Sequence, residues 1–237
     1  NIVFRMKNIL LYFLVFCSVL SLQAQDIVTT TGQRKSVVLE EFTGIKCTFC
    51  PDGHLRAKGI ADNYPGRVVL INVHAGGFAI PSAGDPDFRT DEGEELDDFV
   101  GVSGYPSGTV NRRFHNNDYD YGRGEWAGVA AEVVEEVSPV NVGAKTTYDP
   151  MTRELTIITE VYYTKDSETS ENRLIIALTQ DDIEGPQIGA SRNPDDILPN
   201  GLYNHGHMLR DYITGPFGSV ISETTQGSLY VDTLVYT

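Results

Sequence analysis

The sequence predicts an α/β domain followed by an all-β sandwich, and two features of the 237 residues carry this prediction. Up to Ser138, short apolar runs alternate with segments of helical periodicity, which is typical of α/β domains. After Pro139 the helical period disappears, and β-rich runs separated by turns follow, which is typical of an antiparallel sandwich. We therefore expect residues 25–138 and 139–237 to form two domains.

Residues 1–24 are predicted to be an export signal, with Met6 as the apparent start and a few residues upstream of it. Positive charges at Arg5 and Lys7 precede an apolar run over residues 9–20, and Leu22-Gln23-Ala24 offers a cleavage site. As a helix this run reaches only about 18 Å, well short of the roughly 30 Å needed to cross a bilayer. An uncleaved anchor is the alternative. We expect the mature chain to begin near Gln25, so that Cys17 is lost with the signal.

The charge of the mature chain excludes two classes of partner. Cleavage before Gln25 removes two of the 18 basic residues and none of the 33 acidic ones, which leaves a formal charge of −17. So acidic a surface repels phosphate backbones and anionic headgroups, so we expect no nucleic acid and no peripheral membrane binding. No later segment is apolar enough to span a bilayer, so no transmembrane span is expected in the mature chain.

The first domain is expected to alternate strands with helices. Apolar runs predict strands at 36–42, 67–74 and 107–114, and helices are predicted at 50–63, 91–100 and 126–137. Pro51 is tolerated in the first turn of its helix. The last of these helices is the most strongly indicated, because its apolar residues recur at i, i+3, i+4, i+7, i+8 and i+11.

The second domain is expected to be an immunoglobulin-like sandwich. Strands are predicted at 140–148, 154–164 and 173–180, with one or two more in 219–237. The last run reaches Thr237 without a terminating feature, so we expect the chain to be a truncated product.

Cys47 and Cys50 are the chemically most informative residues. They lie between a predicted strand and the start of a predicted helix, where backbone N–H groups, the helix dipole and the charge of Lys46 stabilise a thiolate at Cys47. Strand, C-x-x-C and helix in this order are the arrangement of a thioredoxin-like redox site.

Two further residues fit the same site. Glu41 lies on the entering strand, where a thioredoxin carries a buried acid that assists proton transfer. Tyr105-Pro106 precedes a later strand and is predicted to be a cis-proline loop facing the cysteines.

Three stretches make the resemblance more specific: EEFTGIKCTFCPDGH at 40–54, GYPSGTVNR at 104–112 and YNHGHMLRDYITGPFG at 203–218. Together they resemble the twenty-eight-kilodalton outer-membrane protein family. This resemblance implies export by a Gram-negative bacterium to the periplasm, outer membrane or cell surface. It also implies a thioredoxin-like domain joined to an immunoglobulin-like one, and a role in surface adhesion. The chain departs from a true thioredoxin, since it has no Trp before Cys47 and no Gly-Pro between the cysteines.

Three roles for the pair remain open. A redox couple would use Cys47 as nucleophile, Cys50 to resolve, and Glu41 with Pro106 to shape the site. A structural clasp gains little chain entropy, about 2 kcal/mol for so small a ring, but the missing thioredoxin residues favour it. A zinc site would need two more ligands, and the histidines His54, His74, His115, His205 and His207 offer no matching spacing. His205-Gly206-His207 is expected to be a loop, and the acidic run at 85–98 a solvated helix with its lead-in.

We therefore expect an exported protein with no metal and no cofactor, in which a thioredoxin-like scaffold serves surface binding or adhesion through an unknown protein partner. The alternative is an extracytoplasmic thiol–disulfide oxidoreductase whose substrate is a protein disulfide.

Overall fold

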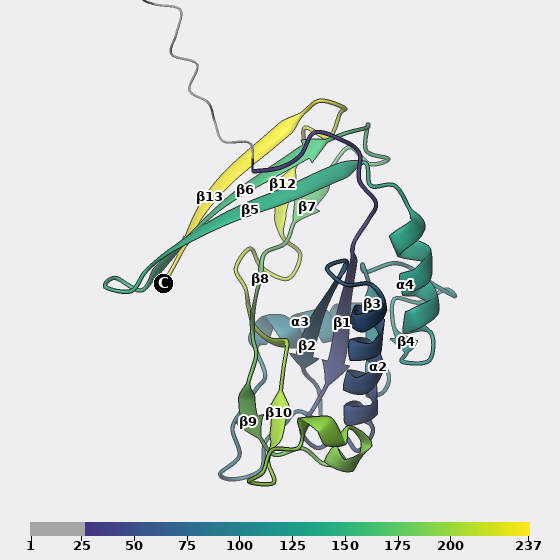
Figure 1. The fold of residues 1–237 in the computed structure, drawn as a ribbon, viewed down its shortest axis with the longest axis vertical. Helices are drawn as coiled ribbons and strands as arrows, with labels where there is room; N and C mark the ends of the chain where they lie inside the picture. Colours follow the sequence, from purple (N-terminus) through teal and green to yellow (C-terminus); the bar gives the residue numbers. More distant parts are fainter. Residues whose placement is uncertain (1–26) are drawn as a thin grey trace, which may run out of the picture.

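The computed structural model describes residues 27–237 (Figure 1). The export signal predicted for residues 1–24 lies outside the described residues. The elements, in chain order, are β1 (Val37–Thr43), α2 (Cys50–Asn63), β2 (Val68–His74), α3 (Asp91–Val100), β3 (Ser107–Val110), β4 (Tyr121–Gly122), α4 (Trp126–Glu135), β5 (Val140–Asp149), β6 (Glu154–Tyr163), β7 (Asn172–Leu174), β8 (Ala177–Gln180), β9 (Ile183–Gly185), η1 (Ala190–Arg192), η2 (Pro194–Asp196), β10 (Tyr203–His205), β11 (Met208–Tyr212), β12 (Ser219–Ile221) and β13 (Leu229–Tyr236).

A mixed six-stranded sheet forms the centre of the α/β part, in the order β4-β3-β1-β2-β11-β8. β1 pairs in parallel with β2 and antiparallel with β3. Helices α2 and α4 cover one face, where Leu39 and the fully buried Trp126 share a core. Helix α3 covers the other face, where Leu96 packs with Phe42 and Leu209 (Figure 1). Apolar side chains on both faces explain why the central strands are almost continuously apolar.

Two strands of this sheet come from the part of the chain beyond Pro139. β11 pairs in parallel with β2 through Met208 and Asn72, and β8 pairs antiparallel with β11. This return of the chain cannot be predicted from the sequence, because short strands carry no sign of which sheet they join.

The other strands after Pro139 form smaller antiparallel sheets. β5, β6 and β13 make a long three-stranded sheet, and β7 pairs with β12 beside it (Figure 1). Val161 and Tyr163 of the first pack with Leu174 and Ile221 of the second, so a separate core lies between them. The protein is therefore a mixed α/β structure with one large sheet, three smaller β-sheets and three helices in its described part.

Most predicted elements are confirmed within two residues at each end, and two differ. β3 ends at Val110, because Asn111 and Arg112 adopt positive φ angles of 52° and 47° that a strand cannot continue. The predicted strand at 173–180 is interrupted at residues 175–176, and its halves β7 and β8 join different sheets. Across residues 27–237, no helix is long and apolar enough to cross a membrane.

Candidate functional site

Cys47 and Cys50 form a disulfide at the start of α2. The Cys50 N–H donates a hydrogen bond to Cys47 Sγ over 3.1 Å, which is the contact that stabilises a thiolate at a helix N-terminus. The exposed fractions of the two residues are 2 % and 0 %, so a partner thiol reaches the disulfide only after a local movement of the chain.

Glu41 and Pro106 meet beside the first turn of this helix. A Cβ atom on Gly53 would lie 3.0 Å from Pro106 and would collide with Glu41 Oε1, so a glycine is required there. The Tyr105-Pro106 peptide bond is cis, as predicted. Glu41 is 1 % exposed, and neither carboxyl oxygen has a hydrogen-bond partner in the described part of the chain. Desolvation raises the pKa of Glu41 well above its usual value, and the more distant charge of Arg123 opposes this only in part.

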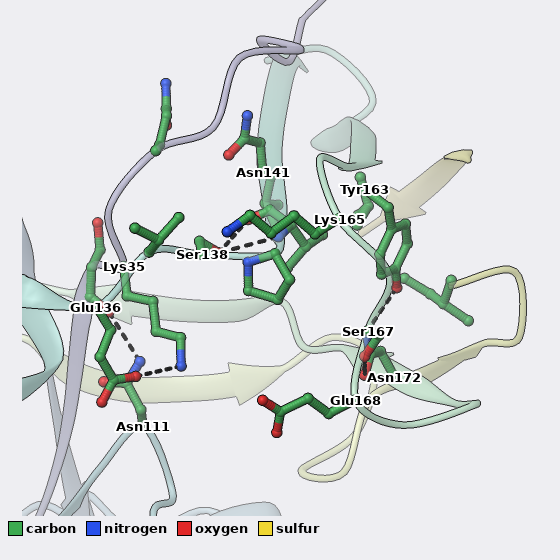
Figure 2. A pocket seen from close by; sticks show the side chains of 18 of the residues that line it. Lys35, Asn111, Glu136, Ser138, Asn141, Tyr163, Lys165, Ser167, Glu168 and Asn172 are labelled. Atoms are coloured by element: carbon green, nitrogen blue, oxygen red, sulfur yellow. Dashed lines mark hydrogen bonds and ion pairs between the residues drawn. The ribbon is translucent and has the colours of Figure 1, made fainter. Parts of the chain in front are cut away.

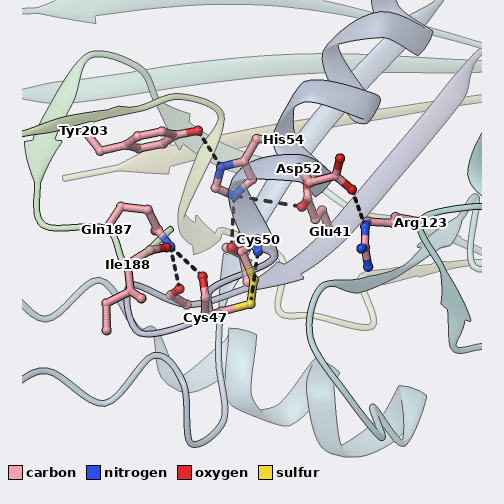
Figure 3. Close-up of a disulfide and its surroundings, with 11 residues drawn as sticks. Glu41, Cys47, Cys50, Asp52, His54, Arg123, Gln187, Ile188 and Tyr203 are labelled. Atoms are coloured by element: carbon pink, nitrogen blue, oxygen red, sulfur yellow. Dashed lines mark hydrogen bonds and ion pairs between the residues drawn. A yellow bond between two sulfur atoms is a disulfide. The ribbon is translucent and has the colours of Figure 1, made fainter. Parts of the chain in front are cut away.

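His54 lies one helical turn after Cys50 and connects Glu41 to a distant strand (Figure 3). Its Nε2 is 2.9 Å from Thr43 Oγ1 and 3.9 Å from Glu41 Oε1, and its Nδ1 is 3.0 Å from the Tyr203 hydroxyl. Burial lowers the pKa of His54 to about 3, so the ring is neutral at physiological pH. Tyr203 comes from β10, 149 residues further along the chain.

Two more buried histidines extend this group away from the disulfide. His205 stacks edge-on against both Tyr203 and His74, with ring centroids 5.1 and 5.4 Å apart, and Phe88 packs against both histidines. Burial lowers the pKa of His205 to about 4 and that of His74 well below its usual value. Within residues 27–237, no three His, Cys, Asp or Glu side chains are arranged to hold a metal ion.

The segment after β9 covers the cysteine loop, and we call residues 186–192 the cover. The Gln187 side chain donates hydrogen bonds to the carbonyls of Gly44 and Cys47, over 3.2 and 3.1 Å (Figure 3). The Ile188 N–H donates to the Ile45 carbonyl over 2.8 Å. Gly189, at a φ of 74°, lies against the Thr48 backbone so closely that a Cβ atom would collide with it.

An aromatic side chain between two cations marks the exposed rim of the site. Phe49, between the cysteines, is 47 % exposed, and the guanidinium carbons of Arg192 and Arg123 lie 4.4 and 5.7 Å from its ring centroid. Arg123 also donates to Asp52 over 2.5 Å and lowers the pKa of that carboxyl.

The four residues singled out from the sequence thus meet at the start of α2: Cys47, Cys50, Glu41 and Pro106. Sequence reasoning considered His54 only as a metal ligand, although its i+4 spacing from Cys50 places it on the same helix face. It missed Tyr203 and Gln187, which carry no local signal because they reach the site through the long connection after β9.

The family model described as outer membrane protein Omp28 matches residues 94–234. The chain belongs to this family. It is accordingly an outer-membrane-associated or surface protein of a Gram-negative bacterium, as the three motifs indicated. No curated protein matches the sequence of this Omp28-family chain.

Two solved structures share the fold of this Omp28-family protein. HBP35 of Porphyromonas gingivalis superposes with a TM-score of 0.66 at 19 % identity, covering 86 % of this chain and 64 % of that one. The chain therefore spans less than two thirds of HBP35. A structural genomics target from Agrobacterium tumefaciens superposes with a TM-score of 0.51 at 14 % identity, covering 86 % of this chain and 80 % of that one.

Replacing Gly189 with alanine is expected to lift the cover and expose the disulfide. The new methyl group collides with the Thr48 backbone, so the hydrogen bonds of Gln187 and Ile188 are lost with the contact. We expect reduction of the disulfide by a small dithiol to become at least about fivefold faster, because the dithiol then no longer has to wait for a local opening of the cover.

Gly201→Ala is the matched control for this variant. Gly201 also has a positive φ, of 83°, but a Cβ atom there meets nothing within 4 Å. Equal reduction rates in the Gly189 and Gly201 variants would show that the cover does not control access.

Proposed function

We propose that this protein is an exported thiol–disulfide exchange protein, with Cys47 as the nucleophile and Cys50 as the resolving cysteine. The observation that carries the proposal is the carboxyl group of Glu41, buried beside the helix of the cysteines without a hydrogen-bond partner in the described residues. A buried polar group without a partner costs roughly 1–3 kcal/mol. A structural clasp does not need such a group, whereas disulfide exchange needs an acid and base beside a buried thiol.

The reaction follows from the placement of these groups. In the oxidised protein an incoming thiolate bonds to Cys47 Sγ, the bond between the two sulfurs breaks, and its electron pair leaves on Cys50 Sγ. Protonated Glu41 supplies the proton that this buried thiolate requires. In the reverse direction the Glu41 carboxylate removes the proton from Cys50, which then attacks the mixed disulfide and releases the partner thiol.

The finer fold assignment belongs to the same proposal. The parallel β1–β2 pair with α2 between them, the antiparallel β3 and the cis Pro106 support a thioredoxin-like domain. The packing of the three-stranded sheet on the β7–β12 pair supports an immunoglobulin-like β unit. Since β8 and β11 belong to the large sheet, we propose that β5, β6 and β7 of the β unit are inserted into the thioredoxin-like part. The remaining strands of the unit, β12 and β13, follow that part in the chain.

Trapping of a mixed disulfide tests the proposed nucleophile. Cys50→Ser leaves Cys47 without its resolving partner, so we expect it to form a stable mixed disulfide with a small aromatic disulfide. Cys47→Ser, which keeps Cys50, should react at least about tenfold more slowly because the Cys50 thiol lacks the N–H contact that stabilises a thiolate at Cys47. Equal labelling of both variants would contradict the assignment.

A second candidate, surface binding or adhesion, is favoured by a separate observation. An open cavity of about 1050 Å³ lies between the start of β1 and the β unit (Figure 2). Lys35, Asn141, Tyr163, Lys165, Glu168 and Asn172 are among the polar side chains that line it. Lys35 is held by Glu136 over 2.6 Å, whereas Lys165 has no ion pair among the described residues.

A photo-crosslinking amino acid in place of Lys165, on intact cells, tests this second role. Specific binding in the cavity predicts a discrete crosslinked product that is absent when the same group replaces Lys145, an exposed residue of β5. Identical products from both positions would contradict binding in this cavity.

A further inference from the structure

Glu41 has no direct route to solvent through the described residues. Its carboxyl oxygens are buried, Cys50 is 0 % exposed, and the cover closes the outer side of the cysteine loop. A group that exchanges one proton in each catalytic cycle must nevertheless be recharged from water. His54, the nearest polar side chain to the Glu41 carboxyl group, is the first candidate for this recharging.

A row of proton-carrying groups leads away from Glu41, with one gap at its first step. His54 Nε2 lies 3.9 Å from Glu41 Oε1, so a carboxyl rotation of about 1 Å brings the two into hydrogen-bond distance. His54 Nδ1 is 3.0 Å from the Tyr203 hydroxyl, which in turn lies 3.3 Å from Asp196 Oδ2. The Asn193 side chain donates to the Tyr203 oxygen over 2.9 Å and holds it in line.

This row ends in water. Asp196 lies on η2 and is partly exposed, and a cavity of about 430 Å³ is lined by His54, Tyr203 and Asp196 together with Lys58 and Asp182. The cavity lies further along α2 than the disulfide, against residues 54–62, and none of the cover residues lines it. Protons can therefore enter without a path past the cover.

From this geometry we infer that His54, Tyr203 and Asp196 form a proton relay that connects Glu41 to the cavity between α2 and β10. The inference rests on the proposed function and assigns three residues that act through Glu41 without touching the sulfurs. Neutral His54 passes the Nε2 proton to the Glu41 carboxylate while Nδ1 takes the hydroxyl proton of Tyr203. The Tyr203 hydroxyl, which donates to Asp196 in the structure, turns toward Nδ1 to transfer its proton, and Tyr203 then takes a proton from cavity water by way of the Asp196 carboxyl group.

The relay balances the reduction of the disulfide by a dithiol. The dithiol supplies two electrons and, in forming its own disulfide, releases two protons to solvent, while the protein takes up two. The first of these goes to the Cys50 thiolate from Glu41 and is replaced through Tyr203. When the protein is oxidised, the proton passes along the same groups in the opposite direction, from Glu41 to the cavity.

Tyr203→Phe tests the relay, because it removes one hydroxyl and keeps the ring that packs on His205. We expect reduction by dithiothreitol at pH 6 to become at least about tenfold slower than in the wild-type protein. At pH 9 the difference between the two rates should shrink to about threefold or less, since the thiolate of Cys50 is a less unfavourable leaving group at that pH and less of the reaction depends on the proton. A merely structural role of the hydroxyl would change the rate by the same factor at every pH.

Three variants complete the test. Tyr121→Phe is the matched control, since its buried hydroxyl accepts a hydrogen bond from the Val110 N–H in another core, and it should match the wild type at both pH values. Asp196→Asn, which lies nearer the surface, is expected to slow disulfide reduction at pH 6 in the same way. It serves as the test if Tyr203→Phe does not fold. In a Glu41→Gln background Tyr203→Phe should have no further effect, because the relay then has no acceptor.

The outcomes separate the relay from the proposed function. A wild-type protein that exchanges rapidly, with Tyr203→Phe unchanged or slowed equally at pH 6 and pH 9, overturns the relay alone. If the wild-type protein exchanges disulfides no faster than glutathione, and Glu41→Gln does not change this rate, the exchange function is overturned and the relay with it.

Discussion

Arg112→Met is expected to lower the free energy of unfolding by about 3–5 kcal/mol. Arg112 makes two hydrogen bonds to the Glu40 carboxylate, over 2.7 and 2.5 Å, and Glu40 is only 3 % exposed. The Tyr212 hydroxyl donates a third hydrogen bond to Glu40 over 2.6 Å, across 172 residues of sequence. Methionine fills much of the space but leaves the carboxylate buried without its counter-ion. Urea denaturation at pH 7 measures the loss.

The double variant Glu40→Gln with Arg112→Met separates charge burial from packing. It removes both charges and should be more stable than Arg112→Met alone, because no uncompensated charge remains. Arg34→Met, which breaks the exposed pair with Glu135, should change stability little. If Arg112→Met is as harmless as Arg34→Met, the buried Glu40 carboxylate does not depend on Arg112 for its counter-charge.

Stability is also expected to fall as the pH drops from about 6.5 to 4. Burial lowers the pKa of His54 to about 3, of His205 to about 4 and of His74 well below normal, so the unfolded chain binds three protons that the folded chain does not. Each such proton lowers the free energy of unfolding by about 1.4 kcal/mol for each pH unit of acidification. The contribution of the histidines is fully present above about pH 6.5 and is lost as the pH falls from there through their folded-state pKa values. Glu41, whose pKa is raised well above its usual value, Asp97, whose pKa is raised to about 6, and Asp120, whose pKa is also raised, retain protons when folded and act in the opposite direction. The fall in stability is therefore shallower than the three histidines alone would give.

His205→Phe isolates one histidine of the three. Neither ring nitrogen of His205 makes a hydrogen bond of normal geometry in the described residues, although the Pro186 backbone lies near. Phenylalanine should therefore pack among Phe88, His74 and Tyr203 at little cost. Its unfolding free energy at pH 5 should exceed that of the wild-type protein by more than at pH 7.5. His207→Asn, at an exposed residue whose φ of 54° asparagine tolerates, is the control. A slope unchanged by His205→Phe would contradict the account.

Local pattern determines much of this fold, and the predictions followed it closely. The i, i+3, i+4 spacing fixed α4, and the bounds predicted for α2 and α3 are those observed. What the pattern could not determine is where strands pair. β7 and β8 read as one strand, yet Gly218 and the β12 pairing hold β7 in one sheet while β11 draws β8 into another. The pairing of such strands depends on contacts between residues about 30 or more positions apart in the sequence. Contacts of this kind produce no periodic pattern in the sequence.

The candidate site shows the same division. Cys47, Cys50, Glu41 and Pro106 could be predicted because a strand, a helix start and a turn place them by local rules. Gln187, Tyr203 and Asp196 could not, since they sit in an irregular connection whose path depends on packing against α2. The burial of both cysteines was also beyond the sequence, because it depends on tertiary packing around the cysteine loop.

The reduction potential of the Cys47–Cys50 disulfide, measured in a series of glutathione buffers, tests the central claim most directly. A thiolate-stabilising contact from Cys50 N–H and a buried acid at Glu41 both favour the reduced state of an exchange site. We predict a potential at or above about −230 mV, in the range of exchangeable disulfides. A potential below about −300 mV, in the range of structural disulfides, would contradict the exchange function.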